Sequence, residues 1–302
     1  MSRMTAGLVW GFVGVVAFSL TLPMTRIALR SLDPFQIAIW RAALAACVAS
    51  AIVIVTRTRR PRGAEFGYLV LCAAGTVFGF PVFANLAMTT GSAAHGAVVV
   101  GLLPLATAAV AVAVNRERPG AIFWLSSLLG TAITIAYVLL QSGGNFVLSD
   151  LYLLAAVVSA AVGYAFGGKA AQTMGGWQVS CWALIVALPV ILPLGLTVEP
   201  VPLDAPGDVL LAFAYLGLVS QLSAFFAWYR GLAMGGIARV SQLQLLQLFL
   251  TIFAARILLG EQIGWATFVF GALVAVSVWI GTRAKSASLP ARRWQPGAAG
   301  NT

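Results

Sequence analysis

Runs of about twenty apolar residues follow one another along most of the chain, and charged residues fall mainly between them. Each run is long enough to cross the roughly 30 Å hydrocarbon core of a bilayer as a helix. The runs are continuous rather than alternating, which favours helices over the strands of a membrane barrel. Only 9% of the 302 residues are charged, against about 25% in a soluble globule. The sequence therefore predicts an all-α polytopic membrane protein and excludes soluble, coiled-coil and disordered classes.

Ten transmembrane helices are predicted, separated by short polar connections that contain Pro or Gly. Their expected ranges are 5–29, 35–56, 66–88, 93–114, 121–140, 150–168, 177–197, 207–229, 237–259 and 264–282. The residues after 285 contain no apolar run, and we expect 286–302 to form a disordered, basic cytoplasmic tail that touches anionic lipid.

The basic residues are concentrated on alternate connections, which predicts the orientation of the chain. If the N-terminus is cytoplasmic, most of the 18 Lys and Arg residues face inward. These are Arg3, Arg57, Arg59, Arg60, Arg62, Arg116, Arg118, Lys169, Arg230, Arg239, Arg283, Lys285, Arg292 and Arg293. The connection between the seventh and eighth helices is acidic instead, with Glu199, Asp204 and Asp208. The positive-inside rule therefore predicts a multi-pass inner-membrane protein with both termini in the cytoplasm, and the net charge of +10 needs no nucleic-acid partner.

An internal repeat is expected from one alignment of the chain with itself. Shifting residues 104–119 by 144 positions onto 248–263 matches Thr107 with Thr251 and Glu117 with Glu261. The predicted organisation is two five-helix repeats, 1–145 and 146–285. Because five crossings is an odd number, the second repeat enters the membrane from the opposite side, so the repeats are inverted. Transporters built in this way place their substrate near the midplane between the repeats.

Several segments resemble the EamA-type members of the drug/metabolite transporter superfamily. They are WGFVGVVAFSLTLPMTRIAL from residue 10, PFQIAIWRAALAA with Arg41, and the span ends VNRERP and LLGEQI. Within that group the chain looks most like the YddG-type exporters of aromatic amino acids. The resemblance implies export of aromatic or hydrophobic amino acids by alternating access through a central cavity between the repeats, with no cofactor and no obligate protein partner.

Polar residues inside a span usually face a protein interior or a wet cavity. Ser241, Gln244, Gln247 and Thr251 share one sector of the ninth predicted helix. We expect this polar stripe to bind substrate, since amides can hold both an ammonium and a carboxylate. The alternative is hydrogen bonding between helices without substrate contact.

Faces that combine a ring with an amide are further candidates, because they suit an amino acid whose side chain stacks on rings. The alternative for such faces is packing or contact with lipid. His95, the only histidine, could bind substrate, shuttle a proton or simply meet water at a helix start. The remaining predicted substrate-binding residues are Gln221, Phe225, Trp228, Tyr229, Phe78, Asn85, Tyr164 and Trp182.

Arg41 lies about 9 Å into the second predicted helix. It could extend to the outer interface, or hold helix ends together, or bind a substrate carboxylate. None of the eight acidic residues lies mid-span, so a proton relay through an intramembrane carboxylate is not expected. Facilitated transport is therefore favoured over proton coupling. Helix-breaking prolines predict the gating positions Pro23, Pro81, Pro104 and Pro189.

Two other functions remain open at this level. The chain could export another small metabolite or drug of the same superfamily. It could also be an intramembrane lipid-modifying enzyme, which would need clustered acids or histidines within the spans. The sequence shows no metal-ligand or nucleotide-binding motif with the required residues and spacing, so we expect a transporter whose partners are a small molecule and the bilayer.

Overall fold

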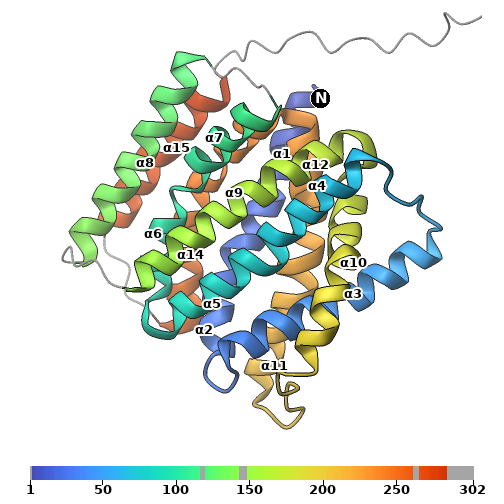
Figure 1. Cartoon of the computed structure of the whole chain (residues 1–302). Coiled ribbons are helices and arrows are strands. Elements are labelled where there is room, and N and C mark those ends of the chain that lie inside the picture. Colours follow the sequence, from blue (N-terminus) through green and yellow to red (C-terminus); the bar gives the residue numbers. More distant parts are fainter. Residues whose placement is uncertain (1, 116–119, 143–147, 261–264, 284–302) are drawn as a thin grey trace, which may run out of the picture.

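The computed structural model describes residues 2–115, 120–142, 148–260 and 265–283, and every regular element in these ranges is helical. Within these described ranges, seven helices are long and apolar enough to cross a membrane. They are Arg3–Ala28, Pro34–Val55, Ala64–Thr90, Leu148–Met174, Gly176–Gly195, Gly207–Gly235 and Ile237–Leu259. The helices run side by side through one bundle (Figure 1). The predicted all-α membrane class is confirmed for the described part of the chain.

The elements up to residue 142 are α1 (Arg3–Ser19), α2 (Thr21–Ala28), α3 (Pro34–Val55), α4 (Ala64–Ala73), the π-helix η1 (Ala74–Gly79), α5 (Phe80–Thr90), α6 (Ala93–Val100), α7 (Leu103–Asn115) and α8 (Ala121–Ser142). From residue 148 they are α9 (Leu148–Met174), α10 (Gly176–Gly195), α11 (Gly207–Ala214), the π-helix η2 (Tyr215–Ser223), α12 (Ala224–Gly235), α13 (Ile237–Ser241), α14 (Gln244–Leu259) and α15 (Trp265–Arg283).

Three of the apolar runs are interrupted, two of them at prolines. A proline lacks the N–H that would bond to the carbonyl four residues earlier. Pro23 leaves the carbonyl of Ser19 without that partner, and α1 ends at Ser19. Pro104 does the same for Val100, where α6 ends. The third interruption, between α13 and α14, has no proline. Of the other predicted gating positions, Pro81 lies in the first turn of α5 directly after η1, and Pro189 lies inside α10.

Glycines that face glycines allow two pairs of helices to approach at backbone distance. A Cβ atom on Gly7 of α1 would lie 2.6 Å from the backbone nitrogen of Gly235 in α12. A Cβ atom on Gly75 of η1 would lie 2.7 Å from the backbone nitrogen of Gly163 in α9. Such close packing is what holds helices together in lipid, where the hydrophobic effect between them is absent.

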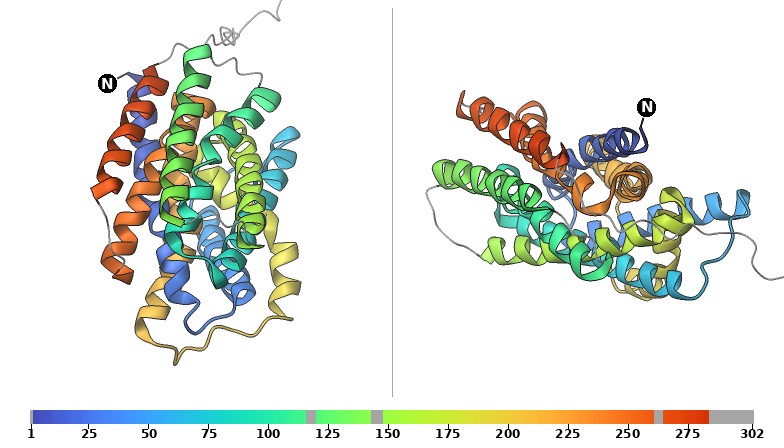
Figure 2. Two further views of the ribbon diagram at one scale, coloured as in Figure 1. Left: turned by 90° about the vertical axis from the view of Figure 1, so that its left-hand side faces the viewer. Right: turned by 90° about the horizontal axis from the view of Figure 1, so that it is seen from above.

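The remaining helices pack in pairs around this centre. α3 lies against α10, α6 against α14, and α7 against α9. α8 and α15 pack side by side at one edge of the bundle, as Figures 1 and 2 show from three directions. The N-terminus and the C-terminal end of α15 lie at the same end of the bundle (Figure 2).

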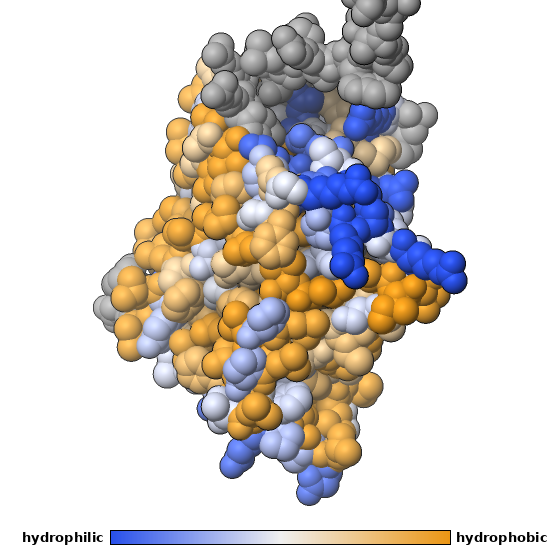
Figure 3. All heavy atoms as spheres, turned by 45° about the vertical axis from the view of Figure 1, so that its right-hand side comes forward, coloured by the Kyte–Doolittle hydropathy of each residue, from blue (hydrophilic) through white to orange (hydrophobic). Residues whose placement is uncertain are grey.

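On the face shown in Figure 3, the surface is apolar over the middle of the bundle, and hydrophilic residues gather at the upper right and at the lower end. Large apolar side chains such as Leu140, Leu196 and Leu211 are at least 74% exposed, as expected for residues that face lipid. At the end opposite the N-terminus, Arg30 forms an ion pair with Asp208 over 3.1 Å.

Candidate functional site

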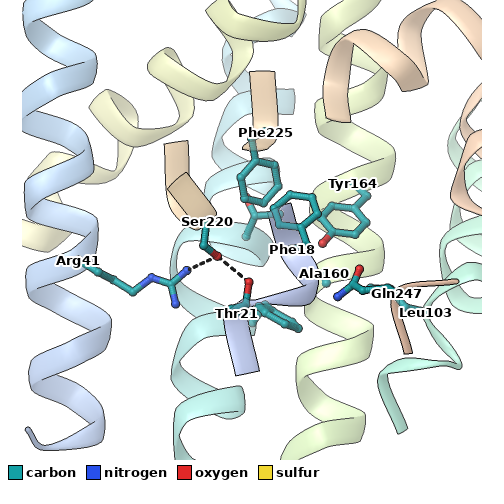
Figure 4. A pocket seen from close by; sticks show the side chains of 11 residues that line it. Phe18, Thr21, Arg41, Leu103, Ala160, Tyr164, Ser220, Phe225 and Gln247 are labelled. Atoms are coloured by element: carbon teal, nitrogen blue, oxygen red, sulfur yellow. Dashed lines mark hydrogen bonds between the residues drawn. The ribbon is translucent and has the colours of Figure 1, made fainter. Parts of the chain in front are cut away.

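A small internal cavity lies where the interrupted helices meet (Figure 4). Its volume is about 20 Å³, which is room for about one water molecule. An organic substrate could enter only if the surrounding helices moved apart. The cavity is lined by Phe18, Thr21, Arg41, Thr76, Phe80, Leu103, Ala160, Tyr164, Ser220, Phe225 and Gln247.

Much of this lining comes from places where the α-helix is broken or widened. Thr21 follows the break after α1, and Leu103 follows the break after α6. Thr76 lies in η1 and Ser220 in η2. Gln247 lies in the first turn of α14, just after its break from α13. Broken helices that surround a central site are typical of membrane transporters, and π-helical turns are frequent at functional sites.

Of the described residues that line the cavity, Arg41 alone is charged. Its side chain projects from α3 and is only 2% exposed, so it does not extend to the membrane interface. The Nη2 atom lies 3.4 Å from Ser220 Oγ, which is 2.8 Å from Thr21 Oγ1. In the described ranges, Arg41 has no carboxylate within ion-pair distance, and its Nε has no hydrogen-bond partner. A buried cation without a counter-charge is costly, so this group favours an anion in the cavity.

Aromatic rings form the apolar side of the cavity. The rings of Phe18 and Phe225 lie 4.8 Å apart edge to face, and Tyr164 lies 6.0 Å from Phe225. Figure 4 shows these three rings together, with Arg41, Ser220 and Thr21 on one side of them and Gln247 on another. The arrangement separates an apolar, ring-lined region from a cationic and hydroxyl-lined region.

Three of the predicted binding residues line this cavity: Gln247, Phe225 and Tyr164. Three others, Gln221, Trp228 and Tyr229, pack directly around the lining. Gln221 Nε2 donates to the carbonyl of Thr76 over 3.1 Å.

Trp228 is completely buried, with its ring 5.4 Å from that of Tyr164. The hydroxyl of Tyr229 lies 3.0 Å from Cys72 Sγ, and its ring stacks on Phe225 at 5.2 Å. These two aromatic residues support the cavity wall without lining it.

The other predicted binding residues lie apart from the cavity lining. Ser241 donates to the carbonyl of Ala238 in its own helix. Asn85 Nδ2 donates to the carbonyl of Pro34 and joins α5 to the start of α3. Gln244 is buried, and its amide has no hydrogen-bond partner in the part of the chain that the structure describes. The half-buried side chains of Phe78 and Trp182 pack against the apolar core.

His95 lies in α6, and its side chain is outside the described part of the structure.

Sequence reasoning missed several lining residues, notably Thr76, Ser220, Phe80 and Phe18. In the third predicted helix the chosen face was the wrong one: Thr76 and Phe80 each lie two residues from Phe78, on the opposite side of the helix, and they line the cavity while Phe78 packs against the core. One signal was available, because Thr76 and Ser220 are separated by the same 144 residues that relate Thr107 to Thr251.

An all-helical membrane bundle with a buried polar and aromatic cavity at helix interruptions defines a membrane transporter. Residues 5–139 and 147–282 each match the EamA-like transporter family, and the chain belongs to this family. The resemblance found in the sequence is therefore confirmed at the level of the EamA family within the drug/metabolite transporters.

Two relatives match over nearly their whole length. The chain is 42% identical over 279 residues to the uncharacterized transporter YdeK of Bacillus subtilis (strain 168), covering 92% of this chain and 95% of YdeK. It is 25% identical over 299 residues to a probable terminal-alkyne amino-acid exporter of Streptantibioticus cattleyicolor, covering 94% and 98% of the two chains. A protein of known crystal structure superposes with a TM-score of 0.76 at 18% identity, covering 93% and 99% of the chains, and so shares the fold.

Proposed function

We propose that this transporter exports small amino-acid-like molecules that carry a free carboxylate and an apolar or aromatic side chain. The observation that carries the proposal is the buried guanidinium of Arg41, which has no carboxylate partner among the described residues. An Arg can bind a carboxylate through two parallel hydrogen bonds, which combines charge neutralisation with orientation.

The cavity offers a place for each part of such a substrate. Arg41, with the hydroxyl groups of Ser220 and Thr21, binds the carboxylate. Phe18, Tyr164 and Phe225 accept the apolar side chain. The oxygens of Gln247 and Thr76 accept hydrogen bonds from the ammonium group. The Streptantibioticus relative is named as a probable amino-acid exporter, which supports this substrate class. A preference for aromatic side chains, as in the YddG-type exporters, is part of the proposal.

The proposed architecture is ten spans in two inverted repeats, 1–145 and 146–285, with a cytoplasmic tail from 286. Separate family matches to residues 5–139 and 147–282 support the division. So do the two glycine-mediated contacts, because α1 against α12 and η1 against α9 would be equivalent pairs under a two-fold axis that relates the repeats. The N-terminal end of α1 and the C-terminal end of α15 lie at the same end of the bundle, which agrees with an even number of crossings. The basic connections support placing both termini in the cytoplasm, at the inner membrane.

The proposed mechanism is alternating access by facilitated transport. A cavity of about 20 Å³ must widen to admit an amino acid, and the helix breaks at Pro23 and Pro104 with the widened turn before Pro81 give places for movement. Among the described residues, no Asp or Glu lines the cavity, which favours flux down the substrate gradient over proton coupling.

The direct test is uptake of radiolabelled phenylalanine and leucine into proteoliposomes, with and without a pH gradient. We expect saturable flux that is indifferent to the gradient, and no flux of phenylalaninamide, which lacks the carboxylate. Arg41→Gln should lower kcat/KM at least ten-fold, and Arg60→Gln, which removes an exposed charge far from the cavity, should have no effect. Absence of saturable flux for every amino acid, or an unchanged Arg41→Gln variant, contradicts the proposal.

The ring-lined part of the cavity is tested separately at Tyr164. Tyr164→Phe keeps the ring and should transport normally. Tyr164→Ala should reduce the preference for phenylalanine over alanine, because the ring contacts that favour the larger side chain are lost. If both variants showed the same preference for phenylalanine over alanine, the ring of Tyr164 would not be part of the substrate site.

A further inference from the structure

A second hollow opens on the surface between α4 and α9, near the connection from α3. Its volume is about 500 Å³, much larger than that of the central cavity. It is lined by Arg59, Arg62, Ala64, Glu65, Tyr68, Lys169, Gln172 and Thr173. We refer to these residues as the basic groove.

One side of the basic groove is fixed by Glu65. Its two carboxylate oxygens accept hydrogen bonds from the guanidinium of Arg59 at 2.7 and 2.8 Å. The backbone nitrogen of Arg62 and the hydroxyl of Thr173 donate to the same carboxylate at 3.0 and 2.9 Å. The hydrogen bonds with Glu65 raise the pKa of Arg59, so this guanidinium stays charged. Glu65 is thus neutralised and ties the connection before α4 to the end of α9.

The other two cations of the groove have no carboxylate partner among the described residues. Lys169 donates to the carbonyl of Val114 over 3.0 Å and lies 4.8 Å above the ring of Tyr68. An ammonium has three N–H donors, so two remain for a ligand. The guanidinium of Arg62 is exposed at the rim. The charges of Arg59 and Glu65 cancel each other, so Lys169 and Arg62 give the groove a net positive charge. This charge favours an anionic ligand.

The surroundings of the groove indicate which kind of anion fits. The groove lies where the Ala64–Thr90 span begins, at the boundary between the apolar belt and the polar end of the bundle. Leu71 lies one turn beyond Tyr68 on the same side of α4 and is 40% exposed, and the ring of Phe166 in α9 lies 6.0 Å from that of Tyr68. A ligand in this position meets charge at one end and an outward-facing apolar surface at the other. That combination matches a lipid better than a free ion.

We propose that the basic groove binds the phosphate headgroup of an anionic phospholipid, whose acyl chains lie along α4 beside Leu71 and Phe166. Lys169 and Arg62 contact the phosphate, and Gln172 offers an amide to the headgroup. A bound lipid would join α4 to α9. α4 leads directly into η1, which contains Thr76, and α9 carries Tyr164. The lipid would therefore stabilise two walls of the central cavity. The proposal does not depend on what the transporter carries.

The experiment uses the full chain in detergent micelles, with phosphatidylglycerol, phosphatidylcholine or inorganic phosphate added in parallel. Thermal unfolding and native mass spectrometry measure stabilisation and bound lipid. We expect phosphatidylglycerol to raise the Tm saturably with about one lipid retained, and the other two additions to have no effect. Lys169→Gln and Arg62→Gln should each weaken phosphatidylglycerol binding about five-fold, the effect of one basic contact near a lipid headgroup.

Arg60→Gln is the matched control, because Arg60 lies in the same connection and carries the same charge but is not part of the groove. It should bind phosphatidylglycerol as the unaltered protein does. An equal loss in Arg60→Gln would show diffuse attraction rather than a site and would overturn the proposal. Stabilisation by inorganic phosphate alone would also overturn it, in favour of a free-anion site. Arg62→Gln keeps the test informative if Lys169→Gln fails to fold, since the Arg62 guanidinium is exposed.

Discussion

Gln221 of η2 donates a hydrogen bond from its Nε2 atom to the backbone carbonyl of Thr76 in η1 over 3.1 Å. Both residues are buried, and each lies in a π-helical segment that also supplies a lining residue of the central cavity. The bond joins two widened turns that are 145 residues apart in the chain. A carbonyl in a π-helical turn does not accept the regular α-helical hydrogen bond from the backbone four residues on. A side-chain donor from a neighbouring helix is therefore a suitable partner.

Removing this bond should loosen the contact between the two π-helical segments. Gln221→Leu leaves the carbonyl of Thr76 without its side-chain donor, and we expect a loss of about 1–3 kcal/mol, seen as a lower Tm in detergent. Ser223→Ala is the control within η2, because the exposed Ser223 hydroxyl bonds only to carbonyls of its own segment. If both variants unfold at the same temperature, the bond between the segments contributes nothing measurable.

Two buried or half-buried arginines should respond in opposite ways to the same substitution. Arg41→Gln removes a buried charge that has no carboxylate partner in the described ranges, so the substrate-free protein should gain about 1 kcal/mol or more. Arg26→Gln breaks hydrogen bonds to the carbonyls of Met88 and Gly91, at 3.0 and 3.2 Å, and should cost about 1–3 kcal/mol. Thermal unfolding without substrate measures both. A large loss of stability in Arg41→Gln would mean that the guanidinium is structural.

The contact between α1 and α12 should tolerate no added carbon atom. A Cβ on Gly231 would lie 2.6 Å from the backbone nitrogen of Gly11, so Gly231→Ala must push the helices apart and should cost about 1–3 kcal/mol. Gly67→Ala is the matched control, since nothing lies within 4 Å of a Cβ at this helical position. It should stabilise the helix slightly, by about 0.5–1 kcal/mol. Equal Tm values for the two variants would contradict the close approach.

The proposed orientation can be measured with single cysteines in a chain whose Cys47, Cys72 and Cys181 are replaced by Ala. Leu203→Cys lies in the connection before α11, where Leu203 is 90% exposed. Arg60→Cys lies in the connection before α4, at the other end of the bundle. A membrane-impermeant maleimide should label Leu203→Cys in intact cells and Arg60→Cys only after the membrane is opened. The reverse pattern would place the termini outside the cytoplasm.

The general class of this protein could be predicted from sequence because membrane helices are encoded locally. About twenty apolar residues suffice for a span, and prolines such as Pro23 and Pro104 mark real ends of helices. The family also followed from short motifs around Arg41 and in the first helix. None of these features requires knowledge of contacts between distant segments.

The site was harder to predict because periodicity alone does not say which face of a helix meets the cavity. Phe78 and Asn85 share one face at 100° per residue, but Thr76 and Phe80, on the opposite face, line the cavity instead. Gln244 and Gln247 share a sector of α14, yet only Gln247 lines the cavity. Helical periodicity identifies a buried polar face, but tertiary packing decides which part of that face meets a substrate.

The uncompensated charge of Arg41 also has a kinetic consequence. When the carrier closes around an empty site, this guanidinium must leave water without gaining an anion, whereas a loaded site closes around a neutralised pair. Reorientation of the unloaded carrier therefore has the higher barrier. Counter-exchange of substrate across the membrane never uses that step, but net efflux uses it in every cycle. A carrier built around a solitary buried arginine is thus expected to exchange its substrate faster than it empties the cell.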